Sequence, residues 1–244
     1  MPLPLLLLSA TEFEVEPLTA SFSPDESLSA GLPDGWRARS GQVAGVPTVA
    51  VATGVGKANA AAITALAVTA ARPGAVLLVG IGGAYPGTEL RISQAVVALS
   101  ETHLDTGVGH SEEWQDMRSI GFPLLPSTTK RPEAAYNRID LAPRSADLAT
   151  QLNLPADHFG TAEAVTADTH TASLLRSRHA VAVESMEGAA VAQVAAALGV
   201  PLYQVRGISN QVGDRDKSNW RVAEAVAASC AAARSAAPLL PEVK

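Results

Sequence analysis

Acidic and amide side chains follow apolar segments of the sequence at places where they could act on a small substrate. Glu187 lies between an apolar segment at 180–183 and another at 189–198. Asn210 comes soon after a further apolar segment at 202–208. If the two short segments are strands of a parallel α/β sheet, their carboxyl ends meet at the edge where ligands bind. The spacing therefore predicts one site to which both side chains contribute.

Three acidic residues, Glu12, Glu14 and Glu16, alternate after the first apolar segment. Carboxylates are favoured near a helix N-terminus by the helix dipole, which accounts for two of them and leaves one for a function. Alternate side chains of an extended segment share a face, so spacing alone does not choose among the three.

Two glycine-rich segments follow predicted strands. The first, at 54–56, has the start of a dinucleotide-binding fingerprint, but Asn59 occupies its third glycine position. The second, at 82–87, precedes Thr88 but lacks the lysine of a phosphate loop. Both are interpreted as loops in which the backbone approaches a small planar ligand.

Several other reactive side chains are better explained by structure. His103, Asp105 and His110 could bind a metal ion, but their spacing matches no familiar metal motif. Cys230 lies in an alanine-rich segment and is expected to be a buried helix residue. Arg206 lies within an apolar strand and is expected to be an internal ion-pair partner.

The chain alternates predicted strands and helices, which is typical of an α/β protein with a largely parallel sheet. The predicted strands are 5–9, 36–42, 46–52, 75–79, 93–100, 158–165, 180–183 and 202–208. The predicted helices are 57–71, 168–176, 189–198 and one that Ser218 caps and that ends before Pro238. Residues 23–35 are predicted to form a loop, and residues 102–126 to be irregular. Since no linker or repeat is visible, a single domain is expected over 1–244.

Composition narrows the classes of partner. The 244 residues are 47% hydrophobic and 17% charged, which is enough apolar material for a large core. A net charge of −6 argues against nucleic acid or an anionic membrane as a partner. The single cysteine fits a reducing cytoplasm. The apolar start has no basic region before it, so a buried strand is expected there rather than a signal peptide.

Four motifs occur in order along the chain, and on them it resembles the nucleoside phosphorylase/nucleosidase family. They are SATEFEV at 9–15, GVGK at 54–57, GIGGA at 80–84 and ESMEGAA at 184–190. A fifth stretch, RGISNQVGDRDKSNW at 206–220, is most similar to the futalosine hydrolases of that family. The resemblance implies a three-layer α/β/α fold, no cofactor or metal, and a homodimer or larger homo-oligomer.

The resemblance also implies roles for individual residues. Glu14 matches the carboxylate that activates the attacking water, and Met186 and Glu187 match residues that lie against the ribose. Asn210 stands where adenine-specific relatives carry Asp. An amide donates through its NH₂ and accepts through its carbonyl, which suits the 6-oxo group of hypoxanthine and a protonated N7.

Four further residues are implied to surround the purine. Ile81 and Gly82 would offer backbone groups to the base, and Val165 and Thr166 would pack beside it.

The function implied is hydrolysis of the N-glycosidic bond of futalosine, in menaquinone biosynthesis, to hypoxanthine and dehypoxanthinyl futalosine. Three alternatives stay open: a nucleosidase for another purine nucleoside, such as methylthioadenosine or adenosylhomocysteine; a purine nucleoside phosphorylase; and a nucleoside-binding protein without catalysis. A carboxylate beside the anomeric carbon repels phosphate and favours water, which favours hydrolysis over phosphorolysis.

Two expectations concern the periphery of the site. The implied substrate carries a benzoate, for which Arg215 and Lys217 are candidate cations by charge. A solvated ion-pair cluster at 214–217 is the equal alternative. The loop 102–122 is a candidate cover for the site of its own or of a neighbouring subunit.

Overall fold

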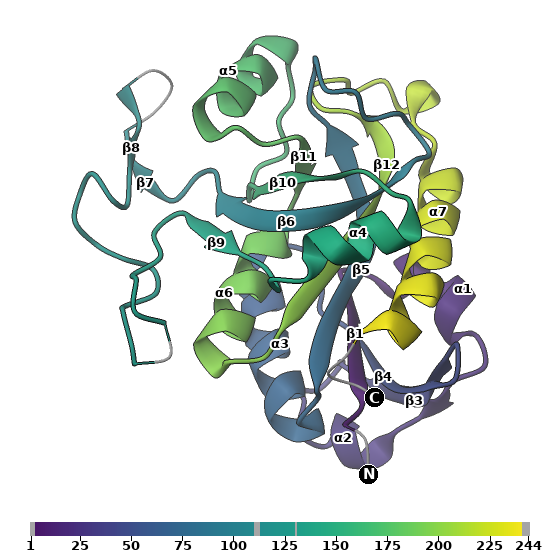
Figure 1. Cartoon of the computed structure of the whole chain (residues 1–244). Helices are drawn as coiled ribbons and strands as arrows, with labels where there is room; N and C mark the ends of the chain where they lie inside the picture. Colours follow the sequence, from purple (N-terminus) through teal and green to yellow (C-terminus); the bar gives the residue numbers. More distant parts are fainter. Residues whose placement is uncertain (1–2, 110–112, 130, 241–244) are drawn as a thin grey trace.

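A mixed β-sheet with helices on both faces makes up the fold (Figure 1). The computed structural model describes residues 3–109, 113–129 and 131–240. The strands, in spatial order, are β11 (Val183–Ser185), β10 (Ala156–Thr161), β6 (Ala95–His103), β12 (Leu202–Gln211), β5 (Ala75–Ala84), β1 (Leu5–Ser9), β4 (Val46–Ala52), β3 (Ala38–Val43) and β2 (Ser23–Pro24), with β9 (Arg138–Asp140) paired to β6. The predicted α/β class is confirmed.

The centre of the sheet is parallel, as β4, β1, β5 and β12 pair in the same direction. Beyond them β12 pairs antiparallel with β6, and β6, β10 and β11 are again parallel. β11 also pairs antiparallel with the end of β5, where Glu184 lies opposite Gly83. The pairings therefore close into a ring, in which the ends of β5, β11 and β12 come together. Its five strands are β5, β12, β6, β10 and β11.

Helices cover both faces of the sheet because its strands are apolar on both sides. On one face are α1 (Glu16–Thr19), α4 (Ser145–Leu152) and α7 (Val222–Ala236), and on the other are α3 (Lys57–Ala71) and α6 (Gly188–Leu198) (Figure 1). Alternation along β1 shows the two cores directly. Leu5 and Leu7 pack into the core beneath α7, whereas Leu6 and Leu8 pack into the core beneath α3 and α6.

The structure corrects several predicted elements. The glycine-rich segment after Val79 is the second half of β5, and not a loop. Ser218 lies in a 3₁₀ turn, η3 (Lys217–Asn219), and α7 begins at Val222 instead. The predicted loop 23–35 contains a short helix, α2 (Glu26–Ser29), and α4 and β9 were not predicted. The irregular segment 102–126 contains a small hairpin of β7 (Gly107–Val108) and β8 (Gln115–Asp116).

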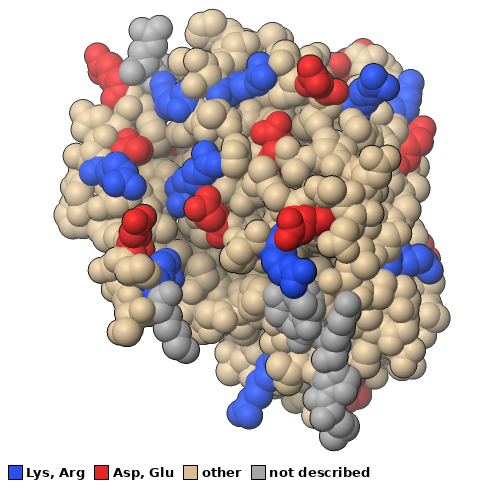
Figure 2. All heavy atoms as spheres, viewed as in Figure 1, with Lys and Arg blue, Asp and Glu red and all other residues tan. Residues whose placement is uncertain are grey.

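Charged side chains of both signs are interspersed over the face shown in Figure 2. No continuous field of one sign covers this face. In the ranges that the structure describes, no helix is both long and apolar enough to cross a membrane.

Candidate active site

A cavity of about 350 Å³ opens where β5, β11 and β12 end, and we call it the site cavity. It is lined from these strands, from η1 (Glu12–Glu14) and from the turn before α3. All eight of the predicted site residues line it: Glu14, Ile81, Gly82, Val165, Thr166, Met186, Glu187 and Asn210. Segments that are distant in the sequence therefore meet at one place.

Glu14 is the buried member of the three acidic residues. The segment is a 3₁₀ helix, not an extended strand, so Glu14 points inward while Glu12 and Glu16 are exposed. The Thr11 N–H and hydroxyl donate to its Oε2 at 3.0 and 3.1 Å, and the Ile81 N–H donates to its Oε1 at 3.0 Å. Three donors fix the carboxylate in one orientation, as a positioned general base requires.

Gly80 explains why glycine occupies the middle of β5. A Cβ at this position would lie 2.6 Å from both the Glu14 carboxylate and the Arg206 guanidinium. Only glycine leaves room for these two groups to meet against the strand. Gly80 thus allows close packing of charged groups against a strand, whereas Gly82 and Gly83 of the same strand line the site cavity.

Arg206 is the cation of the site. Its side chain on β12 is 1% exposed and pairs with Glu14 at 4.0 Å and with Glu187 at 3.5 Å. It also donates to the Ile81 carbonyl at 3.0 Å. The predicted internal ion pair is present, but Arg206 lines the site cavity as well, which the sequence analysis missed. A charged residue inside an apolar strand was the available indication.

Glu187 stands at the N-terminus of α6 and faces the cavity. Its Oε1 accepts from the Gly56 N–H at 3.2 Å. Gly56 has a φ of +90°, a conformation that glycine adopts readily, and this turn aims the N–H at the carboxylate. Burial raises the pKa of Glu187, while the Arg206 guanidinium opposes that rise. The charged form of Glu187 therefore depends on Arg206.

Asn210 reaches the cavity because β12 carries a bulge. Ile208 pairs with Gly82 and Asn210 with Gly83, so Ser209 is an extra residue in the strand. A bulge re-aims side chains, and here both Ser209 and Asn210 line the cavity. The Asn210 Nδ2 donates to the Gln211 carbonyl at 2.9 Å, and the Ser209 hydroxyl donates to Oδ1 at 2.8 Å. One amide hydrogen and one Oδ1 lone pair remain for a ligand.

Glu184 is a second lining residue without a predicted role. Its carboxylate accepts from the Thr166 N–H at 3.0 Å, from the Thr166 hydroxyl at 2.6 Å and from the Tyr85 hydroxyl at 2.6 Å. These bonds fix the 165–166 segment beside Asn210. In the sequence, the one feature that could have identified Glu184 is a carboxylate at the end of a predicted strand.

The mouth of the cavity is apolar. Phe13, Val55 and Val165 line it and are 58%, 50% and 44% exposed. Trp220 lies at the same rim, with the Arg215 guanidinium 5.2 Å from its ring centroid. Such a rim suits an apolar substituent on a ligand whose polar part lies deeper.

The charged run 214–217 forms a turn. The Asp216 carboxylate accepts from the Ser218 N–H at 3.0 Å, and Asp214 accepts from the Asp216 N–H at 2.9 Å. Arg215 lies over the Trp220 ring at the rim, and Lys217 is exposed. Binding of a benzoate by either stays a prediction.

The other reactive residues lie outside the site cavity. Asp105 pairs with Lys57, and His103 is buried, which lowers its pKa to about 4. His110 lies outside the described residues; among those described, no three His, Cys, Asp or Glu side chains gather as metal ligands. Cys230 is buried in α7, where its Sγ–H donates to the Glu14 carbonyl at 3.2 Å.

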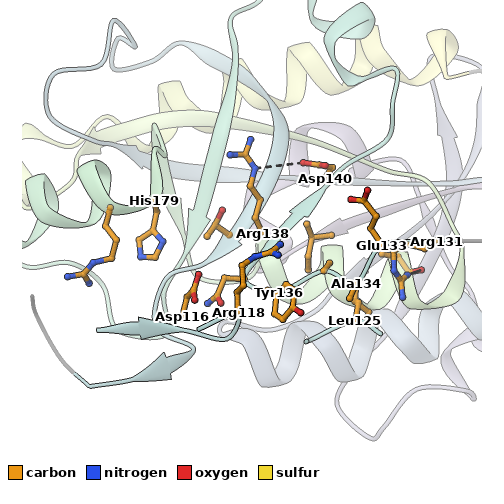
Figure 3. A pocket seen from close by; sticks show the side chains of 16 residues that line it. Asp116, Arg118, Leu125, Arg131, Glu133, Ala134, Tyr136, Arg138, Asp140 and His179 are labelled. Atoms are coloured by element: carbon orange, nitrogen blue, oxygen red, sulfur yellow. Dashed lines mark hydrogen bonds and ion pairs between the residues drawn. The ribbon is translucent and has the colours of Figure 1, made fainter. Parts of the chain in front are cut away.

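A larger hollow of about 710 Å³ lies elsewhere and contains none of the predicted residues (Figure 3). Its arginines already have partners. Arg138 pairs with Asp140, Arg131 donates to two backbone carbonyls, and Arg118 stacks on Tyr136. We therefore assign the candidate active site to the smaller cavity, where buried carboxylates converge.

The loop 102–122 belongs to the larger hollow. Thr102, Asp116 and Arg118 line that hollow, and none of the loop's described residues lines the site cavity. The β7–β8 hairpin projects from the body of the molecule (Figure 1). A cover over the chain's own site is therefore not seen in the described part of the loop, and a cover over a neighbour's site stays a prediction.

Comparisons with known proteins agree with this geometry. Residues 4–243 match the family model of the phosphorylase superfamily. The chain is 37% identical over 193 residues to the futalosine hydrolase of Thermus thermophilus, covering 78% of this chain and 81% of that protein. It is 35% identical over 219 residues to the futalosine hydrolase of Streptomyces coelicolor, covering 87% and 83%.

A solved structure shows the same fold. The 5′-methylthioadenosine/S-adenosylhomocysteine nucleosidase of Colwellia psychrerythraea, in complex with adenine, superposes with a TM-score of 0.78. The two chains are 19% identical, and the match covers 100% of this chain and 97% of the other.

Replacing Arg206 with Met should destabilise the protein in a pH-dependent manner. Without the guanidinium, the pKa of Glu187 rises further, so the folded protein binds a proton more tightly than the unfolded chain. The stability of the variant therefore falls as the pH rises from the pKa of Glu187 in the unfolded chain through its higher pKa in the folded protein. We expect a loss of about 3–5 kcal/mol at pH 8, and a smaller loss at pH 5, by urea denaturation. Arg206→Lys, which keeps the charge, is the control; an equal loss at both pH values would contradict the coupling.

Proposed function

Because the chain belongs to the phosphorylase superfamily, we propose that it is an N-glycosyl hydrolase that releases hypoxanthine from futalosine, a step of menaquinone biosynthesis. The charge balance of the site cavity favours hydrolysis over phosphorolysis. Three carboxylates line it, those of Glu14, Glu184 and Glu187, against one cation among the described residues, Arg206. That cation is already paired with two of them. Phosphate would meet net repulsion here, whereas water would not.

Glu14 is the proposed base. A water that attacks the anomeric carbon gives a proton to the Glu14 carboxylate while its oxygen forms the new bond to carbon. The N-glycosidic bond breaks, and its electron pair leaves with the purine, which takes up a proton from solvent while Glu14 returns its proton to solvent. One water is thereby consumed, as a hydroxyl on the sugar and a hydrogen on the purine. The donors from Thr11 and Ile81 keep the carboxylate in place, so no reorientation precedes the proton transfer.

Glu187 is proposed to bind the ribose of the nucleoside, and Asn210 its base. Glu187 accepts hydrogen bonds from the ribose hydroxyls, and its charge stabilises the positive charge that develops on the sugar. Asn210 binds the base through its free amide hydrogen and carbonyl lone pair, with Ile81 and Gly82 on one side and the 165–166 segment on the other. Asn210 lies opposite Gly83, two to three residues along β5 from the Glu14 contact, or about 7–10 Å.

Met186 lines the same cavity and is proposed to pack against the ribose. A homodimer or larger homo-oligomer, a single domain and a cytoplasmic location stay predictions of the sequence, as does independence from any cofactor or metal.

The proposal is tested by incubating futalosine with the protein, with and without inorganic phosphate, and measuring free hypoxanthine. Release without phosphate is expected. Release only with phosphate would identify a phosphorylase. Binding without release would identify a non-catalytic binding protein. Release of base from 5′-methylthioadenosine or adenosylhomocysteine, but not from futalosine, would identify an adenine nucleosidase.

Replacing Glu14 with Gln should abolish hydrolysis, because an amide cannot accept the proton of the attacking water. We expect kcat to fall by about 10²–10⁴-fold in a variant that still folds, although the loss of a charge beside Arg206 lowers its thermal unfolding midpoint. Glu12→Gln is the matched control, since Glu12 lies two residues away on the same 3₁₀ helix and is exposed. Full activity of the Glu14 variant would exclude this base.

Replacing Asn210 with Asp should shift the choice of base. A carboxylate repels the 6-oxo group of hypoxanthine but accepts from the 6-amino group of adenine. We expect the ratio of kcat/KM for a hypoxanthine nucleoside to that for its adenine analogue to fall about tenfold or more. Asn153→Asp, at the distant end of α4, adds the same charge and should leave the ratio unchanged. An unchanged ratio in the Asn210 variant would remove this account of base recognition.

A further inference from the structure

Glu187 occupies a position at which a carboxylate would ordinarily turn away from the site cavity. It is the N-cap residue of α6, and the first backbone N–H groups of a helix need acceptors. The positive end of the helix dipole also attracts a negative side chain. Left to these forces, the Glu187 carboxylate would fold back onto its own helix.

Other groups satisfy the start of α6 instead. The Gly188 N–H donates to the Ser185 hydroxyl at 3.4 Å, and the Ala189 N–H donates to the Thr161 hydroxyl at 2.9 Å. The next two N–H groups, of Ala190 and Val191, donate to the Glu187 backbone carbonyl. The Glu187 side chain makes no capping bond and accepts from Gly56 across the cavity.

Glu101 orients the Thr161 hydroxyl, which makes the shorter of the two side-chain hydrogen bonds at the start of α6. The Thr161 hydroxyl has one hydrogen, which it donates to Glu101 Oε2 at 2.9 Å, so its lone pairs are free to face Ala189. The other oxygen, Oε1, accepts from Gln204 Nε2 at 2.9 Å. Glu101 is fully buried on β6 and is not among the residues that line the site cavity.

Gly188 is a second indication that the fold places Glu101 at the start of α6. A Cβ at this position would overlap the Glu101 carboxylate, and the next residue it would meet is Gln204, whose Nε2 would lie at 3.0 Å. The first helical residue is therefore one that lets Glu101 lie directly beneath the helix N-terminus.

We propose that Glu101 and Thr161 are positioning residues: Thr161 caps α6 in place of Glu187, and Glu101 holds the Thr161 hydroxyl for that bond, so that the Glu187 carboxylate is free to bind the sugar. This inference rests on the proposed role of Glu187 in binding ribose. It assigns a reason for a fully buried carboxylate behind the site, which the reaction itself does not use.

Thr161→Val tests the proposal, because valine has a similar shape but no hydroxyl to accept from Ala189. Glu187 should then turn back to cap α6, which raises KM and lowers kcat, with kcat/KM reduced roughly tenfold to a hundredfold. Thr161→Ser keeps the hydroxyl and should restore most of the activity. Thr64→Val is the matched control, since the Thr64 hydroxyl is buried and has no hydrogen-bond partner among the described residues.

A crystal structure of the Thr161→Val variant separates positioning from packing. The Glu187 carboxylate is expected within hydrogen-bond distance of the Gly188 or Ala189 N–H and away from Gly56. A carboxylate that still faces Gly56 would overturn the proposal, as would equal activity losses in the Val and Ser variants. If wild-type protein releases no hypoxanthine, the proposed function fails, but the position of Glu187 in the variant still decides this inference.

Discussion

A single buried guanidinium holds the candidate site together. Arg206 lies between Glu14, near the start of the chain, and Glu187, some 170 residues later, and it contacts both. Removing one member of such a buried cluster leaves an uncompensated charge, which is far more costly than any surface ion pair. The backbone around it is arranged for this contact: Gly80 leaves the space, and Ile81 hydrogen-bonds both Glu14 and Arg206. The geometry of the candidate site and the stability of the core therefore depend on the same interaction.

Much of this arrangement could be predicted from the sequence. The apolar segments marked most of the strands, and the glutamate between a strand and a helix marked Glu187. The motifs shared with the family brought together eight residues that all line one cavity. These features are local in the chain, or are carried by short motifs, and a sequence displays both directly.

Other features depended on long-range structure. Choosing Glu14 over Glu12 and Glu16 required the 3₁₀ turn, because the difference between them is burial. The aim of Asn210 required the bulge at Ser209, which appears only when β12 pairs with β5. The glycines after Val79 predict a loop, because a strand interior rarely contains so many. Groups from other segments explain them: the Glu14 and Arg206 side chains lie against Gly80, and the Glu184 backbone carbonyl lies against Gly82.

The pairing of β11 with β5 makes the floor of the site rigid. Glu184 lies opposite Gly83, which itself pairs with Asn210, so the strand that leads to Glu187 and the strand that carries Asn210 belong to one closed ring of backbone hydrogen bonds. Separating the two ends would require breaking strand pairs, not moving a hinge. The entropy of bringing these groups together is thus lost once, when the protein folds, and not again for each substrate. Turnover in such a framework depends on motion at the apolar rim, because the floor of the cavity has little freedom to open.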